Sequence, residues 1–115
     1  MAADADRIAA VVGRVQQQVP KLAKLKLVFG VELTSGGLMG PAKSDRFSVE
    51  LPGPKVSEGS ADDERIQLSM PRTMFDVLAA EGQLVDWREA FIYGHLKVAG
   101  DSRVKRLLGQ AIGGV

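Results

Sequence analysis

The sequence predicts an α+β domain in which helices cover one face of a mainly antiparallel sheet of five strands. Segments in which apolar residues recur every second position cluster in the first two thirds of the chain. Segments with a helical period mainly follow them. A chain of 115 residues has the size of one ordinary domain. We therefore predict a single domain over residues 1–115.

The N-terminal segment has the pattern of an amphipathic helix. Asp4 or Asp6 is suited to cap this helix, and Pro20 is expected to end or kink it. Between these positions, apolar residues recur at the spacing that places them on one helical face. They are Ile8, Val11, Val12, Val15 and Val19.

Five later segments alternate between apolar and polar residues, as strands with one buried face do. Glycine and proline predict a loop at residues 35–45 and a turn at Pro52-Gly53-Pro54, and a polar segment at 59–64 is expected to turn at the surface. The expected strands span residues 24–34, 46–51, 55–58, 65–70 and 95–99.

Three further helices are predicted in the second half of the chain. Pro71 suits the first position of one helix, which Gly82 ends. Asp86 and Glu89 form a capping-box-like pair for a short second helix that stops at the next glycine. Asp101 is expected to cap the last helix. Its apolar face contains Val104, Leu107, Leu108, Ala111 and Ile112.

Composition and motifs exclude several classes of function. The net charge is +1, so the chain lacks the large excess of positive charge that is typical of proteins that bind nucleic acid. The absence of cysteine excludes disulfides, thiolate nucleophiles and cysteine metal sites. No phosphate-binding loop, dinucleotide fingerprint or serine-hydrolase elbow occurs. We expect no catalytic residue, no metal and no cofactor.

The N-terminus, MAADADRIAAVV, carries acidic residues where a signal peptide has basic ones. No apolar run approaches the length of a membrane span. We therefore expect a soluble, cytoplasmic protein.

The stretch from Asp86 to Asp101 contains the only Trp, the only Tyr and the only His. Alternation places Leu96 and Val98 on the inner face of the predicted strand and His95 on its open face, beside Lys97. A lone exposed histidine is more often a solvated residue than a base, because catalysis needs a group that orients it and a nucleophile.

The same stretch carries a longer pattern. From Ala90 to Asp101 the chain reads Ala-Phe-x-x-Gly-x-Leu-Lys-x-x-Gly-Asp. It follows a strand at 65–70 and a helix with Phe75 and Leu78, and it precedes an amphipathic helix. In order and spacing, these features resemble the sterol carrier protein type-2 family. Two departures from the family are expected: Pro71 stands where a polar cap is usual, and the chain is expected to lack the basic tail and targeting signal of eukaryotic members.

The resemblance implies an apolar tunnel between sheet and helices that takes up fatty acid, acyl-CoA or phospholipid, with sterol less favoured. Met70, Met74, Phe75, Leu78, Leu84, Trp87, Phe91, Val104, Leu107, Leu108 and Ile112 are expected to provide its lining. Basic residues are expected to contact lipid head groups or a membrane surface. They are Arg72, Arg103, Lys105 and Arg106.

Three hypotheses follow. The first is a lipid-binding or lipid-transfer protein, monomeric or weakly dimeric, that touches membranes transiently. The second is a protein-interaction module with a collapsed tunnel, which would use the open sheet face or an edge at the third or fifth strand. The third is an enzyme that acts on a bound lipid through His95.

Overall fold

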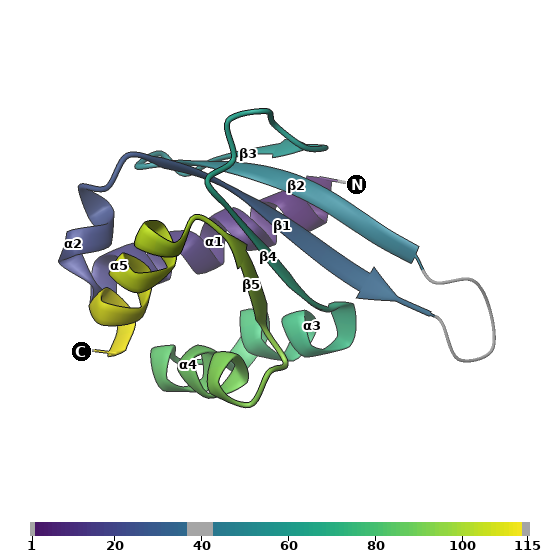
Figure 1. Ribbon diagram of the computed structural model, residues 1–115. Helices are drawn as coiled ribbons and strands as arrows, with labels where there is room; N and C mark the ends of the chain where they lie inside the picture. The colour runs from purple at the N-terminus through teal and green to yellow at the C-terminus, as the bar shows by residue number, and fades with distance from the viewer. Residues whose placement is uncertain (1, 37–42, 114–115) are drawn as a thin grey trace.

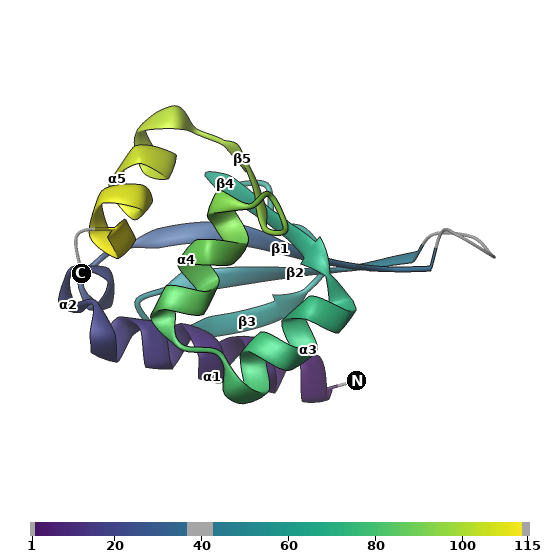
Figure 2. The same ribbon diagram turned by 90° about the horizontal axis from the view of Figure 1, so that it is seen from below.

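In the part of the chain that the structure describes, five helices lie on one face of a five-stranded sheet (Figures 1 and 2). The computed structural model describes residues 2–36 and 43–113, apart from the side chains at positions 2, 3, 21, 22, 81, 84, 108 and 111–113. The strand order is β3-β2-β1-β4-β5. The predicted fold class is therefore confirmed, and the edges of the sheet are β3 and β5, as predicted.

The sheet is mixed, with antiparallel pairs predominating. The central strand β1 pairs antiparallel with β2 and parallel with β4, and the outer pairs β2–β3 and β4–β5 are antiparallel. The strands are β1 (Leu27–Ser35), β2 (Lys43–Leu51), β3 (Lys55–Glu58), β4 (Ile66–Pro71) and β5 (Lys97–Gly100).

Three strand starts differ from the prediction by two residues or more. β1 begins at Leu27 and not at residue 24, because helix α2 (Pro20–Ala23) occupies the chain up to Ala23. The other two are those of β5 and β2. β5 begins at Lys97 and not at residue 95, because the backbone N–H groups of His95 and Leu96 both bond to the carbonyl of Ala90 and close the end of the preceding helix. β2 begins at Lys43, inside the predicted loop at 35–45, because β1 and β2 continue their pairing as far as Ser35 and Lys43. The remainder of that loop, residues 37–42, lies outside the described residues.

The connection from β3 to β4 returns over the face of the sheet that the helices leave open. The backbone N–H of Arg65 bonds to the carbonyl of Val28 at 2.8 Å. A Cβ placed on Gly30 would lie 2.5 Å from Oε1 of Glu64. Gly30, in the middle of the central strand, thus leaves room for the Glu64 side chain. The connection from β3 to β4 can therefore cross the sheet here and place β4 beside β1.

The first helix begins earlier than predicted, but it ends just before Pro20, as predicted. Helix α1 (Ala2–Gln18) starts before Asp4, so neither predicted aspartate caps it. Asp4 lies in the first turn, where a negative charge favours the helix dipole, and its carboxylate accepts a hydrogen bond from Arg72. After a break at Val19, Pro20 begins a short second helix, α2 (Pro20–Ala23), because proline is well tolerated at a first helical position.

The next two helices are α3 (Arg72–Glu81) and α4 (Leu84–Ile92). Pro71 caps α3, one position before its predicted place, and Gly82 ends it as predicted. α4 begins three residues earlier than predicted, because Asp86 serves inside its first turn by accepting the backbone N–H of Gln83 at 2.8 Å.

Helix α1 is fixed to α3 by Arg7. Its guanidinium bonds to Asp76 at 2.7 Å and lies 5.3 Å from the ring centroid of Phe75. This ring faces the sheet side of the helical layer and is buried. Leu33, Val49 and Ile66 are the most completely buried large side chains, so the densest core lies over β1, β2 and β4.

We predict that Gly100→Ala destabilises the protein by about 2 kcal/mol, since the residue has a φ of 116° and a new Cβ would lie 2.6 Å from the carbonyl oxygen of Arg65. Gly13→Ala is the control: it has open space around it in α1 and should stabilise by about 0.5–1 kcal/mol. Urea unfolding measures both. An unchanged midpoint for Gly100→Ala would contradict the strain at this position.

Candidate functional site

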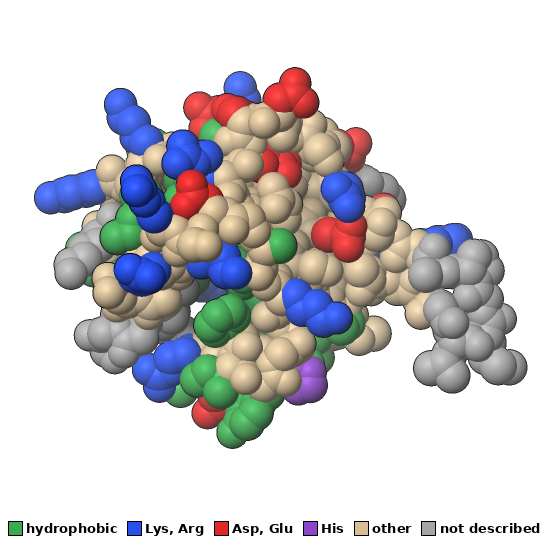
Figure 3. Space-filling view, in the orientation of Figure 1, with side chains coloured by type: hydrophobic (Ala, Val, Ile, Leu, Met, Phe, Trp, Pro, Cys, Tyr) green, Lys and Arg blue, Asp and Glu red, His purple; other side chains and the backbone are tan. Residues whose placement is uncertain are grey.

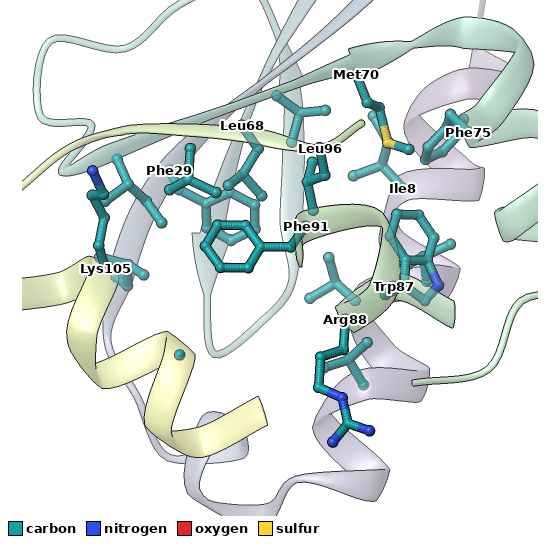
Figure 4. A pocket seen from close by; sticks show the side chains of 18 of the residues that line it. Ile8, Phe29, Leu68, Met70, Phe75, Trp87, Arg88, Phe91, Leu96 and Lys105 are labelled. Atoms are coloured by element: carbon teal, nitrogen blue, oxygen red, sulfur yellow. The ribbon is translucent and has the colours of Figure 1, made fainter. Parts of the chain in front are cut away.

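An apolar cavity of about 380 Å³ lies between the sheet and the helices (Figure 4). Its volume is within the range of about 300–1,000 Å³ that is usual for small-molecule sites. All helices except α2 and all strands except β3 contribute to the described lining, which consists of Ile8, Val11, Val12, Val15, Gln16, Leu27, Phe29, Val31, Leu51, Ile66, Leu68, Met70, Phe75, Trp87, Arg88, Phe91, Ile92, Leu96, Val98, Lys105 and Gly109.

The sheet supplies one wall of the cavity through its two-residue period. Phe29 is in register with Ile66 across the parallel β1–β4 pair, and Val31 is in register with Leu68. These inward-facing rows form a continuous apolar surface because adjacent strands keep alternate side chains on the same face.

The helices supply the opposite wall. Trp87 on α4 packs edge-on against Phe75 on α3, with ring centroids 6.3 Å apart and an interplanar angle of 68°. Phe91, one turn further along α4, points among the sheet residues Phe29 and Leu68 in Figure 4. Edge-on aromatic contacts of this geometry are favourable and stabilise the packing of α3 against α4 in this wall.

Three polar side chains belong to the described lining. Gln16 on α1 donates a hydrogen bond to the carbonyl of Pro52 at 2.6 Å. Arg88 on α4 is partly buried, and Lys105 on helix α5 (Ser102–Gly113) is exposed. The interior is therefore apolar, and its margin carries two cations.

Solved structures share this architecture. The Aedes aegypti sterol carrier protein-2 in complex with palmitate is 20% identical, with a TM-score of 0.58 over 97% of this chain and 96% of that chain. The chain has the sterol carrier protein 2 fold. The palmitated SCP2L2 of Aedes aegypti is 16% identical, with a TM-score of 0.54 over 90% of this chain and 91% of that one.

The sterol carrier protein domain 2 of Helicoverpa armigera also has the fold, at 15% identity and a TM-score of 0.54 over 86% of this chain and 80% of that one. At these identities the likeness establishes the fold alone. No protein-family model matches the sequence, and no curated protein matches it.

Within this sterol carrier protein 2 fold, four of the residues expected to line a tunnel lie in the cavity wall: Met70, Phe75, Trp87 and Phe91. Four others lie elsewhere. Leu78 is buried in the core, Met74 and Val104 pack against it, and Leu107 is exposed on α5. The side chains of Leu84, Leu108 and Ile112 lie outside the described residues.

The basic residues expected to meet head groups are in different surroundings. Lys105 lines the cavity, and Arg103 and Arg106 are exposed on α5. Arg72 bonds to Asp4 at 2.9 Å and also to Asp45. The hydrogen bond to Asp4, reinforced by Asp45, raises the pKa of Arg72 above its ordinary value. Its guanidinium is thus occupied by two carboxylates of the same chain.

Sequence reasoning predicted Met70 on β4, but it missed the contribution of α1, β1, β2 and β5 and of the other lining residues of β4, Ile66 and Leu68. The periods of these segments had identified their inward faces, for example Val12 on α1 and Val98 on β5. A period shows which face is buried but not whether an empty space or another side chain lies opposite. Arg88 was also missed, although its signal is present: the positions three and four residues before and after it are all apolar.

His95 is exposed in the bend before β5 and is not a lining residue of the cavity. In the described part of the chain, no group of three or more histidines and carboxylates is arranged to hold a metal ion. Among the same residues, no helix combines the length and apolarity that crossing a bilayer requires.

Asp101 positions α5 at the cavity margin, as its predicted capping role requires. Its carboxylate accepts the backbone N–H groups of Val104 at 3.3 Å and Arg103 at 2.8 Å, and it pairs with Arg65 at 3.1 Å. These bonds, led by the one from Val104, lower the pKa of Asp101 below its ordinary value of 3.8.

We predict that Asp101 adds to the acid sensitivity of the fold. Because its folded pKa is lowered, its stabilisation is fully present above the ordinary value of 3.8 and is lost as the pH falls through the lower folded value. Asp101→Asn should therefore lose less thermal stability than the wild type between about pH 5 and 2. Thermal unfolding at several pH values measures this, with Asp62→Asn in the exposed 59–65 connection as the control. Equal losses in the wild type and Asp101→Asn would contradict the prediction.

Proposed function

We propose that the chain binds a lipid with a long acyl chain, a fatty acid, acyl-CoA or phospholipid, inside this cavity and transfers it between membranes. The observation that carries the proposal is the apolar cavity between the sheet and the helices. Burying about sixteen methylenes at ~0.8 kcal/mol each gives on the order of 12 kcal/mol before the costs of ordering. Two of the structures with this fold are described as a palmitate complex or as palmitated, which supports a fatty acyl ligand.

The cavity favours lipid binding over the alternative of an interaction module with a collapsed tunnel, because about 380 Å³ between sheet and helices is unfilled. Binding of this kind needs no reaction, and the neighbours are described as carriers, so we propose a carrier and not an enzyme. The absence of cysteine is compatible with the cytoplasm as its compartment.

Trp87 reports directly on the proposed function, since it is the only Trp and lines the cavity. We predict that palmitate shifts its emission to shorter wavelengths as the acyl chain replaces water beside the indole. Val98→Phe should weaken palmitate binding by about tenfold or more, because the added ring occupies space that the ligand needs.

Val56→Phe is the matched control for this experiment. Val56 is also a partly buried valine on an edge strand and packs against the core, but it is not a lining residue. The affinity of the Val56→Phe variant for palmitate should stay at the wild-type level. A wild-type protein that shows no emission change and carries no lipid in native mass spectrometry would disprove the lipid-binding proposal.

Transfer requires contact with a bilayer, and the structure offers a surface for it, which we call the apolar rim: Phe91, Ile92 and Tyr93 at the end of α4 and Leu107 on α5. Their exposed fractions are 49%, 64%, 73% and 55%. Phe91 and Ile92 also line the cavity, so the rim is continuous with its interior. Figure 3 shows hydrophobic side chains gathered over α4 and basic ones toward α5 and α2. Apolar residues beside cations fit an anionic membrane surface.

We predict that Tyr93→Ser combined with Leu107→Ser slows palmitate transfer between anionic vesicles several-fold without changing the equilibrium affinity, because neither residue lines the cavity. A transfer assay between donor and acceptor vesicles measures the rate. Val77→Ser is the control, since Val77 is 61% exposed on α3. Equal rates in the wild type and the double variant would exclude the apolar rim as the docking surface.

A further inference from the structure

We infer that Arg88, with Lys105 as a second cation, binds the negatively charged head group of the ligand and makes the cavity selective for anionic over neutral amphiphiles. The inference rests on the proposed function, because the head group reaches Arg88 only when an acyl chain occupies the cavity. To the proposed function, the inference adds that the ligand is an anionic amphiphile and that Arg88 selects it.

Most arginines of the chain have an identified partner in the described structure. Arg7, Arg46, Arg65 and Arg72 are paired with carboxylates, and Arg14 donates to the carbonyl of Ala79. Among the described contacts, Arg88, Arg103 and Arg106 have none. Arg103 and Arg106 are exposed and solvated, whereas Arg88 is partly buried and lines the cavity.

The helix that carries Arg88 places no carboxylate on the same face. The residues three and four positions away are Leu84, Val85, Phe91 and Ile92, and these are the positions from which a helix supplies an ion-pair partner. Asp86, two positions away, uses its carboxylate to accept the N–H of Gln83. The sequence of α4 therefore leaves Arg88 without an anion.

The elements across the cavity supply no anion either. The described lining contributed by α1 is Ile8, Val11, Val12, Val15 and Gln16, and the amide N–H of Gln16 is given to the Pro52 carbonyl. From α5 the lining contains Lys105 and Gly109. No aspartate or glutamate is present among the described lining residues, so the lining offers neither cation a carboxylate.

Lys105 is in a similar situation on α5. The acidic residue four positions before it is Asp101, whose carboxylate is already engaged by the N–H groups of Arg103 and Val104 and by Arg65. In Figure 4, Lys105 rises from α5 on one side of the cavity, and the guanidinium of Arg88 points away from the apolar side chains on the other. The cations thus mark two places on the margin of one apolar site.

Arg88 is partly buried and no carboxylate of the described lining pairs with its charge, so an anionic head group beside it would form charge-assisted hydrogen bonds. The planar guanidinium of arginine binds carboxylate or phosphate oxygens through two parallel hydrogen bonds. A ligand with a long apolar chain and one anionic head satisfies the apolar interior and Arg88 together. A neutral alcohol or ester satisfies only the interior.

The test compares three ligands that share one acyl chain: palmitate, palmitoyl lysophosphatidate and methyl palmitate. Binding to the full chain is followed by Trp87 emission at neutral pH. We expect the wild type to bind at least one anion about tenfold or more tightly than the ester. Arg88→Gln should lose about ten- to hundredfold in affinity for that anion and retain its affinity for the ester. Lys105→Gln should lose less, since Lys105 is more exposed.

Arg106→Gln is the matched control, because it removes the same charge from an exposed position that does not line the cavity. It should leave all three affinities unchanged. The tighter of the two anions identifies a carboxylate or a phosphate as the preferred head group. Equal wild-type affinity for the three ligands, or equal losses in Arg88→Gln and Arg106→Gln, would overturn the inference while leaving lipid binding intact. Failure of the wild type to bind any of them would instead remove the proposed function.

Discussion

The inward row of the central strand, Leu27, Phe29, Val31 and Leu33, is the constraint on which the rest of the structure depends. β1 has neighbours on both sides, so this row lies in the middle of the sheet and must be removed from water. At one end, Leu33 is fully buried. Toward the other end, Leu27, Phe29 and Val31 face the cavity. The same row thus contributes both to a packed core and to a ligand site.

The protein's own side chains leave the cavity open, because the elements around it are held by contacts at its periphery. Arg7 and Arg14 tie α1 to α3 through Asp76 and the carbonyl of Ala79, at 2.7 and 2.6 Å. Gln16 ties the other end of α1 to the turn after β2. α5 is placed by the cap of Asp101. These bonds hold the helices in place around the cavity. Because protein interiors are otherwise closely packed, an apolar space of this size favours occupation by a ligand.

The sequence was sufficient to predict the fold class and nearly all elements, because the periods of two and 3.6 residues are strong in β1, β2, α1 and α5. It was insufficient where a boundary depends on a distant contact. The start of β5 is set by the carbonyl of Ala90, and the parallel pairing of β4 with β1 is accommodated by the space that Gly30 leaves for Glu64. It was also insufficient to separate lining from core. Leu78 and Phe75 share one helical face, yet Leu78 meets other side chains and Phe75 meets the cavity.

In the function proposed, affinity and selectivity have separate physical origins. The apolar wall attracts any acyl chain, because the hydrophobic effect depends on buried area and has no direction. The orientation of the ligand must therefore be set by polar groups at the margin of the cavity. Arg88 and Lys105 are the cations there, and neither has an identified carboxylate partner among the described lining residues. Phe91 and Ile92 belong to both the cavity wall and the exposed surface. A bilayer that covers them would let the acyl chain enter along continuous apolar surface while the anionic head remains beside the cations, so neither half of the ligand would lose its preferred surroundings during transfer.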